Sequence, residues 1–238
     1  MLHLCYEDLR GMALQLLADY YGTKELPFRP LDPLDFAKNY MKLTVRYENL
    51  SYGRRVILGC IAYENTVLEI NPGDPKSYIP IAERTVFLDE SLKKDKQRGR
   101  RNFTLAHECS HQAIYLLNPE AYGRCQCRTP GERYSLRELT TENDWFEWQA
   151  NALAAELLMP VHLVTKVMSN LGYHGKVPIY PDDKLLYQER CLLRRAADYL
   201  GVSKAALLIR FKQLGLLDYR SREEYLKEEE IDCLIGGY

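Results

Sequence analysis

The sequence predicts an α+β fold in which a small, mostly antiparallel sheet is accompanied by helices. Apolar residues recur at helical spacing near the N-terminus, give way to short β-branched and aromatic runs up to residue 89, and return to helical spacing after residue 101. The length of 238 residues is enough for one full domain with a small appendage and a substantial core.

Two helices are expected before the sheet. The first, over 6–21, is followed by Gly22 as a stop, and the second, over 33–41, has Asp32 as N-cap and Pro33 at its first position. Four short runs then predict three or four strands: residues 43–48, 56–63, 67–71 and 85–89.

A basic run, 93–101, follows the sheet and is interpreted as a solvated loop rather than a binding patch. Helical spacing predicts five further helices, over residues 102–117, 142–159, 160–172, 187–200 and 204–214. Residues 120–141 and 173–183 are expected to be loops. The chain is therefore expected to divide into a domain over 1–172, a helical segment over 173–222 and an acidic tail over 223–238.

Composition narrows the classes of function. The 32 Lys and Arg nearly balance the 33 Asp and Glu, and the net charge of −1 excludes a globally basic nucleic-acid binder. With 46% hydrophobic residues the chain has the composition of a globular protein. No apolar run approaches the length of a membrane span, charged residues interrupt positions 1–21, and the seven cysteines are scattered. We therefore expect a cytoplasmic protein with reduced thiols, no signal peptide and no membrane contact.

The most informative motif is H-E-x-x-H, formed by His107, Glu108 and His111 in the predicted helix over 102–117. Residues i and i+4 share one helix face, so both imidazoles can reach one metal ion, and Glu108 can contact a metal-bound water. Zinc with three protein ligands keeps an open position and acidifies its bound water. The motif alone leaves open the alternative of two histidines buried as core residues.

Zinc needs a third protein ligand from elsewhere in the chain. The extended pattern with a third histidine is excluded, because Leu117 stands at its position. Glu147 and Asn151 lie one turn apart in the otherwise apolar helix over 142–159, where an unpaired carboxylate is unfavourable. We expect Glu147 to bind the metal and Asn151 to orient a ligating histidine. Glu156 is the competing candidate, although a salt-linked carboxylate is its more ordinary interpretation.

Two segments resemble the ImmA/IrrE family of metallo-endopeptidases: FTLAHECSH over residues 103–111 and EWQANALAAELLMP over residues 147–160. The resemblance covers residues 6–217. The chain departs from the family pattern at Ser110, where glycine is common, and in an enlarged loop over 123–141.

The resemblance implies a minimal zincin-like metallopeptidase domain in which His107, His111 and Glu147 bind Zn²⁺ and Glu108 is the general base. Family members of the ImmA type cleave a helix-turn-helix repressor that controls a mobile element or a stress response. We therefore expect an intracellular zinc endopeptidase whose protein substrate is such a repressor.

The expected reaction is peptide hydrolysis by zinc-activated water, with Glu108 accepting the proton. An edge strand, for which residues 85–89 are the candidate, is expected to hold the substrate by strand addition. A donor to the developing oxyanion is also needed. Tyr115 and His174 are candidates, although an ordinary core or surface role is favoured for both.

The last two predicted helices have the spacing of a helix-turn-helix, with a small residue, a turn glycine, a capping serine and a core leucine at Ala197, Gly201, Ser203 and Leu207. Residues 187–222 carry eight basic and three acidic residues, a local charge of +5. The second helix lacks Arg, Asn or Gln where bases would be read, which favours a protein partner over DNA. The alternative function is therefore a non-proteolytic regulator or antitoxin-like protein that binds DNA or a partner through residues 187–217.

Overall fold

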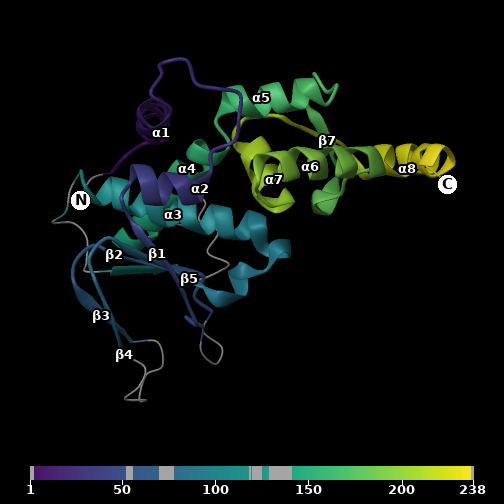
Figure 1. Ribbon diagram of the computed structural model, residues 1–238. Coiled ribbons are helices and arrows are strands. Elements are labelled where there is room, and N and C mark those ends of the chain that lie inside the picture. Colours follow the sequence, from purple (N-terminus) through teal and green to yellow (C-terminus); the bar gives the residue numbers. More distant parts are fainter. Residues whose placement is uncertain are drawn as a thin grey trace. The chain divides into compact units, whose positions relative to one another are not determined.

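The computed structural model describes residues 3–51, 56–69, 78–117, 119, 125–128 and 141–236, with the backbone alone for 69, 125–128 and 230–236. Helices and small sheets are both present (Figure 1), so the predicted α+β fold is confirmed. Internal contacts divide the chain into two compact units, Met1–Leu158 and Met159–Tyr238. The division into parts that end at residues 172 and 222 stays a prediction.

The first unit contains a four-stranded sheet in the order β1-β5-β2-β6. Its strands are β1 (Thr44–Glu48), β5 (Thr85–Asp89), β2 (Gly59–Ala62) and β6 (Cys125–Arg128). β1 runs parallel to β5, whereas β2 is antiparallel to both β5 and β6. A separate antiparallel pair is formed by β3 (Thr66–Glu69) and β4 (Tyr78–Ile81).

The position of β5 in the sheet is a correction. The expectation that residues 85–89 form an edge strand is wrong, because β5 lies between β1 and β2 and is buried along its whole length. A continuous apolar run such as Val-Phe-Leu is typical of a strand that is buried on both faces of its sheet, as β5 is. β6 is a second correction, since it lies inside the segment 120–141 that was expected to be a loop.

Seven helical elements complete the first unit: α1 (Tyr6–Tyr21), α2 (Pro33–Asp35), the π-helical turn η1 (Phe36–Tyr40), the 3₁₀ turns η3 (Glu90–Lys93) and η4 (Asp95–Gln97), α3 (Arg98–Tyr115) and α4 (Glu142–Leu158), counted over the described residues. The caps predicted for the first two are confirmed. Gly22 ends α1 in the left-handed region at φ 65°, and the Asp32 side chain accepts hydrogen bonds from the first turn of α2.

The basic run 93–101 is mostly exposed, but it contains η4 and the start of α3 rather than a loop.

Helix α3 occupies the centre of the first unit. It packs against β2 and β5 on one side and against α4 on another, and α1 in turn packs on α4 (Figure 1). Every residue from Thr104 to Ile114 is buried, although this stretch contains two histidines and a glutamate. Because polar groups are rarely buried without a role, the buried polar residues of this segment are candidates for a functional site.

The second unit consists of helices around a two-stranded parallel sheet. Its elements are α5 (Val161–Asn170), β7 (Val177–Ile179), η6 (Pro181–Asp183), α6 (Tyr187–Leu200), α7 (Lys204–Gln213), β8 (Leu217–Tyr219) and α8 (Arg222–Gly236). Gly201, at φ 68°, joins α6 to α7, and Ser203 caps α7 by accepting a hydrogen bond from Ala206. The loop expected over 173–183 contains β7, and the acidic tail forms α8, where Ser221 and Glu224 make a capping box.

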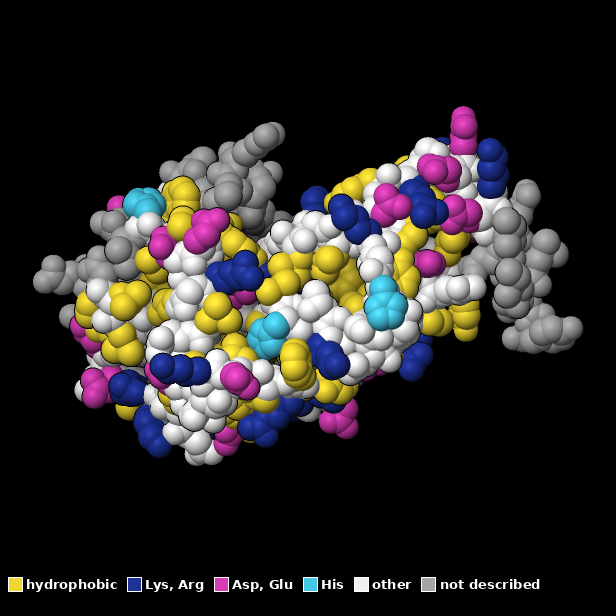
Figure 2. All heavy atoms as spheres, turned by 90° about the horizontal axis from the view of Figure 1, so that it is seen from above, with side chains coloured by type: hydrophobic (Ala, Val, Ile, Leu, Met, Phe, Trp, Pro, Cys, Tyr) yellow, Lys and Arg dark blue, Asp and Glu magenta, His cyan; other side chains and the backbone are white. Residues whose placement is uncertain are grey.

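The surface seen in Figure 2 carries basic and acidic side chains intermixed with apolar ones, in keeping with the near-neutral net charge. Within the described residues no single helix is long and apolar enough to cross a membrane, and only α4 and α5 taken together, as a bent pair, reach that length and composition.

Candidate metal centre

His107 and His111 lie one turn apart on the same face of α3, as their spacing predicted. Their Nε2 atoms are 3.0 Å apart, and the two rings are nearly perpendicular, at 87°. Their side chains are 0% and 1% exposed. Both imidazoles are therefore withdrawn from water and directed at a common point.

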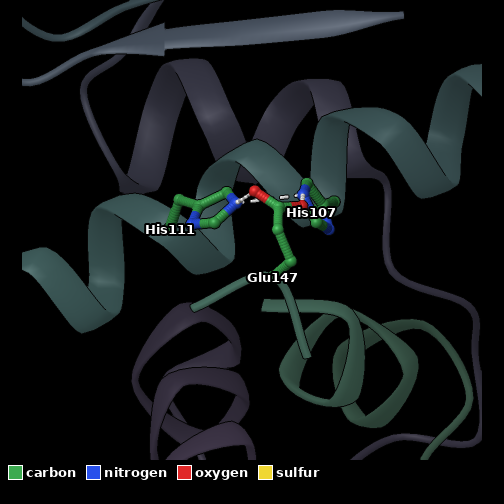
Figure 3. A group of neighbouring side chains, drawn as sticks. All are labelled: His107, His111 and Glu147. Atoms are coloured by element: carbon green, nitrogen blue, oxygen red, sulfur yellow. Dashed lines mark hydrogen bonds and ion pairs between the residues drawn. The ribbon is translucent and has the colours of Figure 1, made fainter. Parts of the chain in front are cut away.

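Glu147 reaches this point from α4. Its Oε2 lies 3.2 Å from Nε2 of His107, and its Oε1 lies 3.2 Å from Nε2 of His111 (Figure 3). Each carboxylate oxygen thus faces one imidazole. The helix that carries Glu147 is fixed on the other side as well, because the Gln149 side chain accepts a hydrogen bond from the backbone of Leu4 just before α1.

Asn151, one turn after Glu147, contacts the opposite side of the His107 ring. Its Oδ1 lies 3.0 Å from Nδ1 of His107. An amide oxygen can only accept, so Nδ1 donates, and the lone pair of the neutral ring is on Nε2, toward Glu147 and His111. The structure thus places Asn151 where it fixes the orientation of the His107 ring.

The charge state of Glu147 follows from its surroundings. Burial raises the pKa of the carboxyl, but the positive charge and hydrogen bonds that the two imidazoles supply when protonated outweigh burial and hold this pKa well below its ordinary range. Glu147 is therefore a carboxylate with positive charge beside it. If both imidazoles are neutral, as they must be to ligate a metal, a metal cation would have to supply that charge.

The three side chains fit a metal ion. His107, His111 and Glu147 each offer one ligand atom, and these atoms lie within 4.8 Å of one another. Zinc–nitrogen and zinc–oxygen bonds of about 2.0–2.1 Å in tetrahedral geometry would separate the ligand atoms by about 3.3–3.4 Å. The contacts of 3.0 and 3.2 Å are close to that separation. Two imidazoles and one carboxylate are also a donor set that suits zinc.

Glu108 is fully buried and is not one of the three clustered residues. Adjacent residues of an α-helix are about 100° apart around its axis, so Glu108 flanks the histidine face of α3. Its carboxylate lies against Gly59 in β2. Gly59 is not among the predicted site residues, and its only signal in the sequence is a glycine inside an apolar strand run.

The remaining candidates are placed as follows. Glu156, the competitor of Glu147, is buried on α4 but lies outside the cluster. Tyr115 stacks on Tyr63, with ring centroids 4.3 Å apart. His174 is exposed and belongs to the second unit. Neither Tyr115 nor His174 joins the cluster, and an oxyanion donor stays a prediction. Most of the enlarged loop over 123–141 lies outside the described residues.

Comparison with known protein families identifies the family of this chain. The Peptidase_M78 family model, described as the IrrE N-terminal-like domain, matches residues 84–212, more than half of the chain. The chain belongs to this family of metallopeptidases. The resemblance to the ImmA/IrrE proteins is thereby confirmed, and the match includes all three clustered residues of this M78 metallopeptidase. No curated protein matches the chain.

Proposed function

We propose that this M78 metallopeptidase is a cytoplasmic, zinc-dependent endopeptidase that cleaves a helix-turn-helix repressor. The observation that carries the peptidase assignment is the buried cluster of His107, His111 and Glu147 with Glu108 beside it on the same helix. Three protein ligands leave the fourth position of a tetrahedral ion open, as catalytic zinc sites require. A purely structural zinc site would have four protein ligands and no need of Glu108.

The chemistry divides between the metal and the protein. Zinc in this site would supply Lewis acidity, lowering the pKa of water to near 7 and polarising the scissile carbonyl. Glu108 accepts the proton of the attacking water and returns it to the leaving amine. Glu147 neutralises charge and holds both imidazoles from the α4 side, and Asn151 keeps the His107 lone pair on Nε2.

The substrate class is inferred from the resemblance to ImmA-type proteins. A repressor of a mobile element or of a stress response would be inactivated when a peptide bond in it is cleaved. The candidates to test are therefore small helix-turn-helix proteins encoded by genes that neighbour this one. We propose that the protein acts on them without a membrane or nucleic acid as partner.

Replacing the base separates metal binding from catalysis. Glu108→Gln keeps the size of the side chain and removes its basicity, so it should retain zinc and lose cleavage by about 100- to 10,000-fold. The measurement is coexpression of each neighbouring helix-turn-helix protein with wild type or variant, with the products mapped by mass spectrometry. Glu142→Gln, an exposed change on α4, is the matched control and should cleave like wild type.

Two results would contradict the proposal. Cleavage that persists in zinc-loaded Glu108→Gln would show that Glu108 is not the general base. If zinc-loaded wild type leaves these helix-turn-helix proteins intact, they are not its substrates.

A second candidate is a regulator that acts by binding through residues 187–217. The observation in its favour is that α6 and α7 present exposed basic and apolar side chains together, including Arg194, Lys204, Tyr199 and Ile209. Such a regulator would keep its effect in Glu108→Gln, whereas a peptidase would lose it.

A further inference from the structure

Gly59 occupies a position in β2 where glycine is unfavourable. The strand is paired on both sides, with Leu88 of β5 and Arg128 of β6 opposite Gly59, and all four of its residues are buried. Glycine in a strand interior loses more backbone entropy than other residues and contributes no packing. A glycine there is typical of a place where another group comes close to the backbone.

The group that comes close is the carboxylate of Glu108. A Cβ added to Gly59 would lie 2.5 Å from Oε1 of Glu108 and 2.7 Å from Cγ2 of Thr104. Thr104 and Glu108 are one turn apart, so both face β2 from the same side of α3. The space that a side chain at position 59 would fill is thus occupied by the carboxylate.

Other glycines show that this crowding is specific. A Cβ added to Gly11 in α1 or to Gly175 would meet nothing within 4 Å. At Gly59, by contrast, a 2.5 Å contact is too short for any side chain, so an atom must move. The carboxylate is the far end of a flexible chain, whereas β2 is held by two neighbouring strands. Thr104 Cγ2 is also too close, at 2.7 Å, but it belongs to a β-branched side chain with little freedom, so the carboxylate moves farthest.

We propose that Gly59 is a positioning residue for Glu108: the absence of a side chain in β2 makes the space in which the carboxylate of the base lies. The metal ligands do not depend on this space, because His107 and His111 face Glu147 on α4. A substitution at Gly59 thus displaces the base and leaves the ligands in place. The effect of Gly59 on catalysis rests on the function proposed above, whereas the packing of Gly59 against Glu108 does not depend on that function.

The packing is tested by thermal unfolding of the full-length, zinc-loaded protein. Gly59→Ala overpacks a buried site and should lower Tm by about 3–10 °C. In a Glu108→Ala background the obstructing carboxylate is gone, and the same substitution should cost clearly less. Gly11→Ala is the control and should not lower Tm, because its added Cβ meets nothing. An equal loss of Tm in both backgrounds would overturn the proposal.

The catalytic consequence is tested with the repressor that wild type cleaves. Gly59→Ala should keep one zinc per chain and the wild-type KM but lose about 100-fold in kcat, since a misplacement of about 1 Å can cost that much. Thr104→Ser, which removes the other contacting atom, should not restore kcat in Gly59→Ala. An unchanged kcat, or restoration by Thr104→Ser, would overturn the proposal. If wild type cleaves nothing, the proposed function fails, and the unfolding experiment still decides whether Gly59 places Glu108.

Discussion

At the scale of single residues, the contact between His107 and Asn151 controls which nitrogen of the imidazole faces the metal site. The 3.0 Å contact from Nδ1 to Oδ1 holds the ring in one tautomer and one orientation. We therefore expect Asn151 to affect metal affinity although it lies outside the cluster of His107, His111 and Glu147.

Asn151→Ala should weaken zinc binding about 10- to 100-fold, because the His107 ring loses its fixed tautomer and orientation. The measurement is competition for zinc with a chromophoric chelator. Asn170→Ala, an exposed change at the end of α5, should leave the affinity unchanged. An Asn151→Ala protein that binds zinc as tightly as wild type would contradict the role given to this contact.

The sequence predicts residues of the site when they are close to one another in the chain. His107 and His111 are one turn apart on one helix, so helical geometry places them together without knowledge of the fold. Glu147 could be proposed because an unpaired carboxylate is unfavourable in an apolar helix, and it was preferred to Glu156 because a salt-linked carboxylate is the more ordinary interpretation of Glu156. Gly59 could not be proposed, because its importance arises only when β2 packs on α3.

At the scale of elements, the sheet depends on contacts that are distant in sequence. β2 pairs with β6 across more than sixty residues, and the apolar–polar alternation of Cys-Gln-Cys-Arg is only four residues long, too short to predict a strand inside a polar segment. β4 is missed for a similar reason, since it is four residues long and contains Pro80. Long helices with caps, such as α1 and α7, are predicted well because their signals are local.

Asp89, at the end of β5, holds the turn into η3 and the segment just after β1 that contains Leu50 and Ser51. Its carboxylate accepts hydrogen bonds from the backbone of Leu50 and Ser91 and from the Ser51 hydroxyl. Burial raises the pKa of Asp89, but these hydrogen bonds outweigh it and hold the pKa below its ordinary value. The folded state therefore favours the ionised form.

Asp89→Asn should lower the free energy of unfolding at pH 7 by about 1–3 kcal/mol, because an amide NH₂ cannot accept these bonds. Asp89 contributes fully to the free energy of unfolding above its pKa in the unfolded chain, which is about 3.9. This contribution is lost as the pH falls through the lower pKa of Asp89 in the folded protein. The difference between wild type and variant should therefore shrink below pH 4. Urea unfolding of metal-free protein at several pH values measures it, with exposed Asp95→Asn as control. A difference that is constant from pH 7 to pH 3 would contradict this role.

At the scale of the whole molecule, the three candidate metal ligands all belong to the unit Met1–Leu158. A ligand that binds only the folded state stabilises it, by about 2.7 kcal/mol at a free concentration one hundred times Kd. Zinc bound at this site should therefore stabilise the first unit.

Removal of zinc by a chelator should lower the Tm of the first unit by about 5–10 °C. Differential scanning calorimetry of the full chain, with and without chelator, measures this difference. A chelator effect of the same size in Glu147→Ala would show that the stabilising metal binds elsewhere.

Elemental analysis of zinc per chain tests most directly whether His107, His111 and Glu147 form a three-ligand zinc site. Wild type should hold one zinc, and Glu147→Ala should hold far less. Glu156→Gln, a change to another buried carboxylate of the same helix, should hold as much as wild type. No zinc in wild type after reconstitution, or equal zinc in wild type and Glu147→Ala, would contradict the claim.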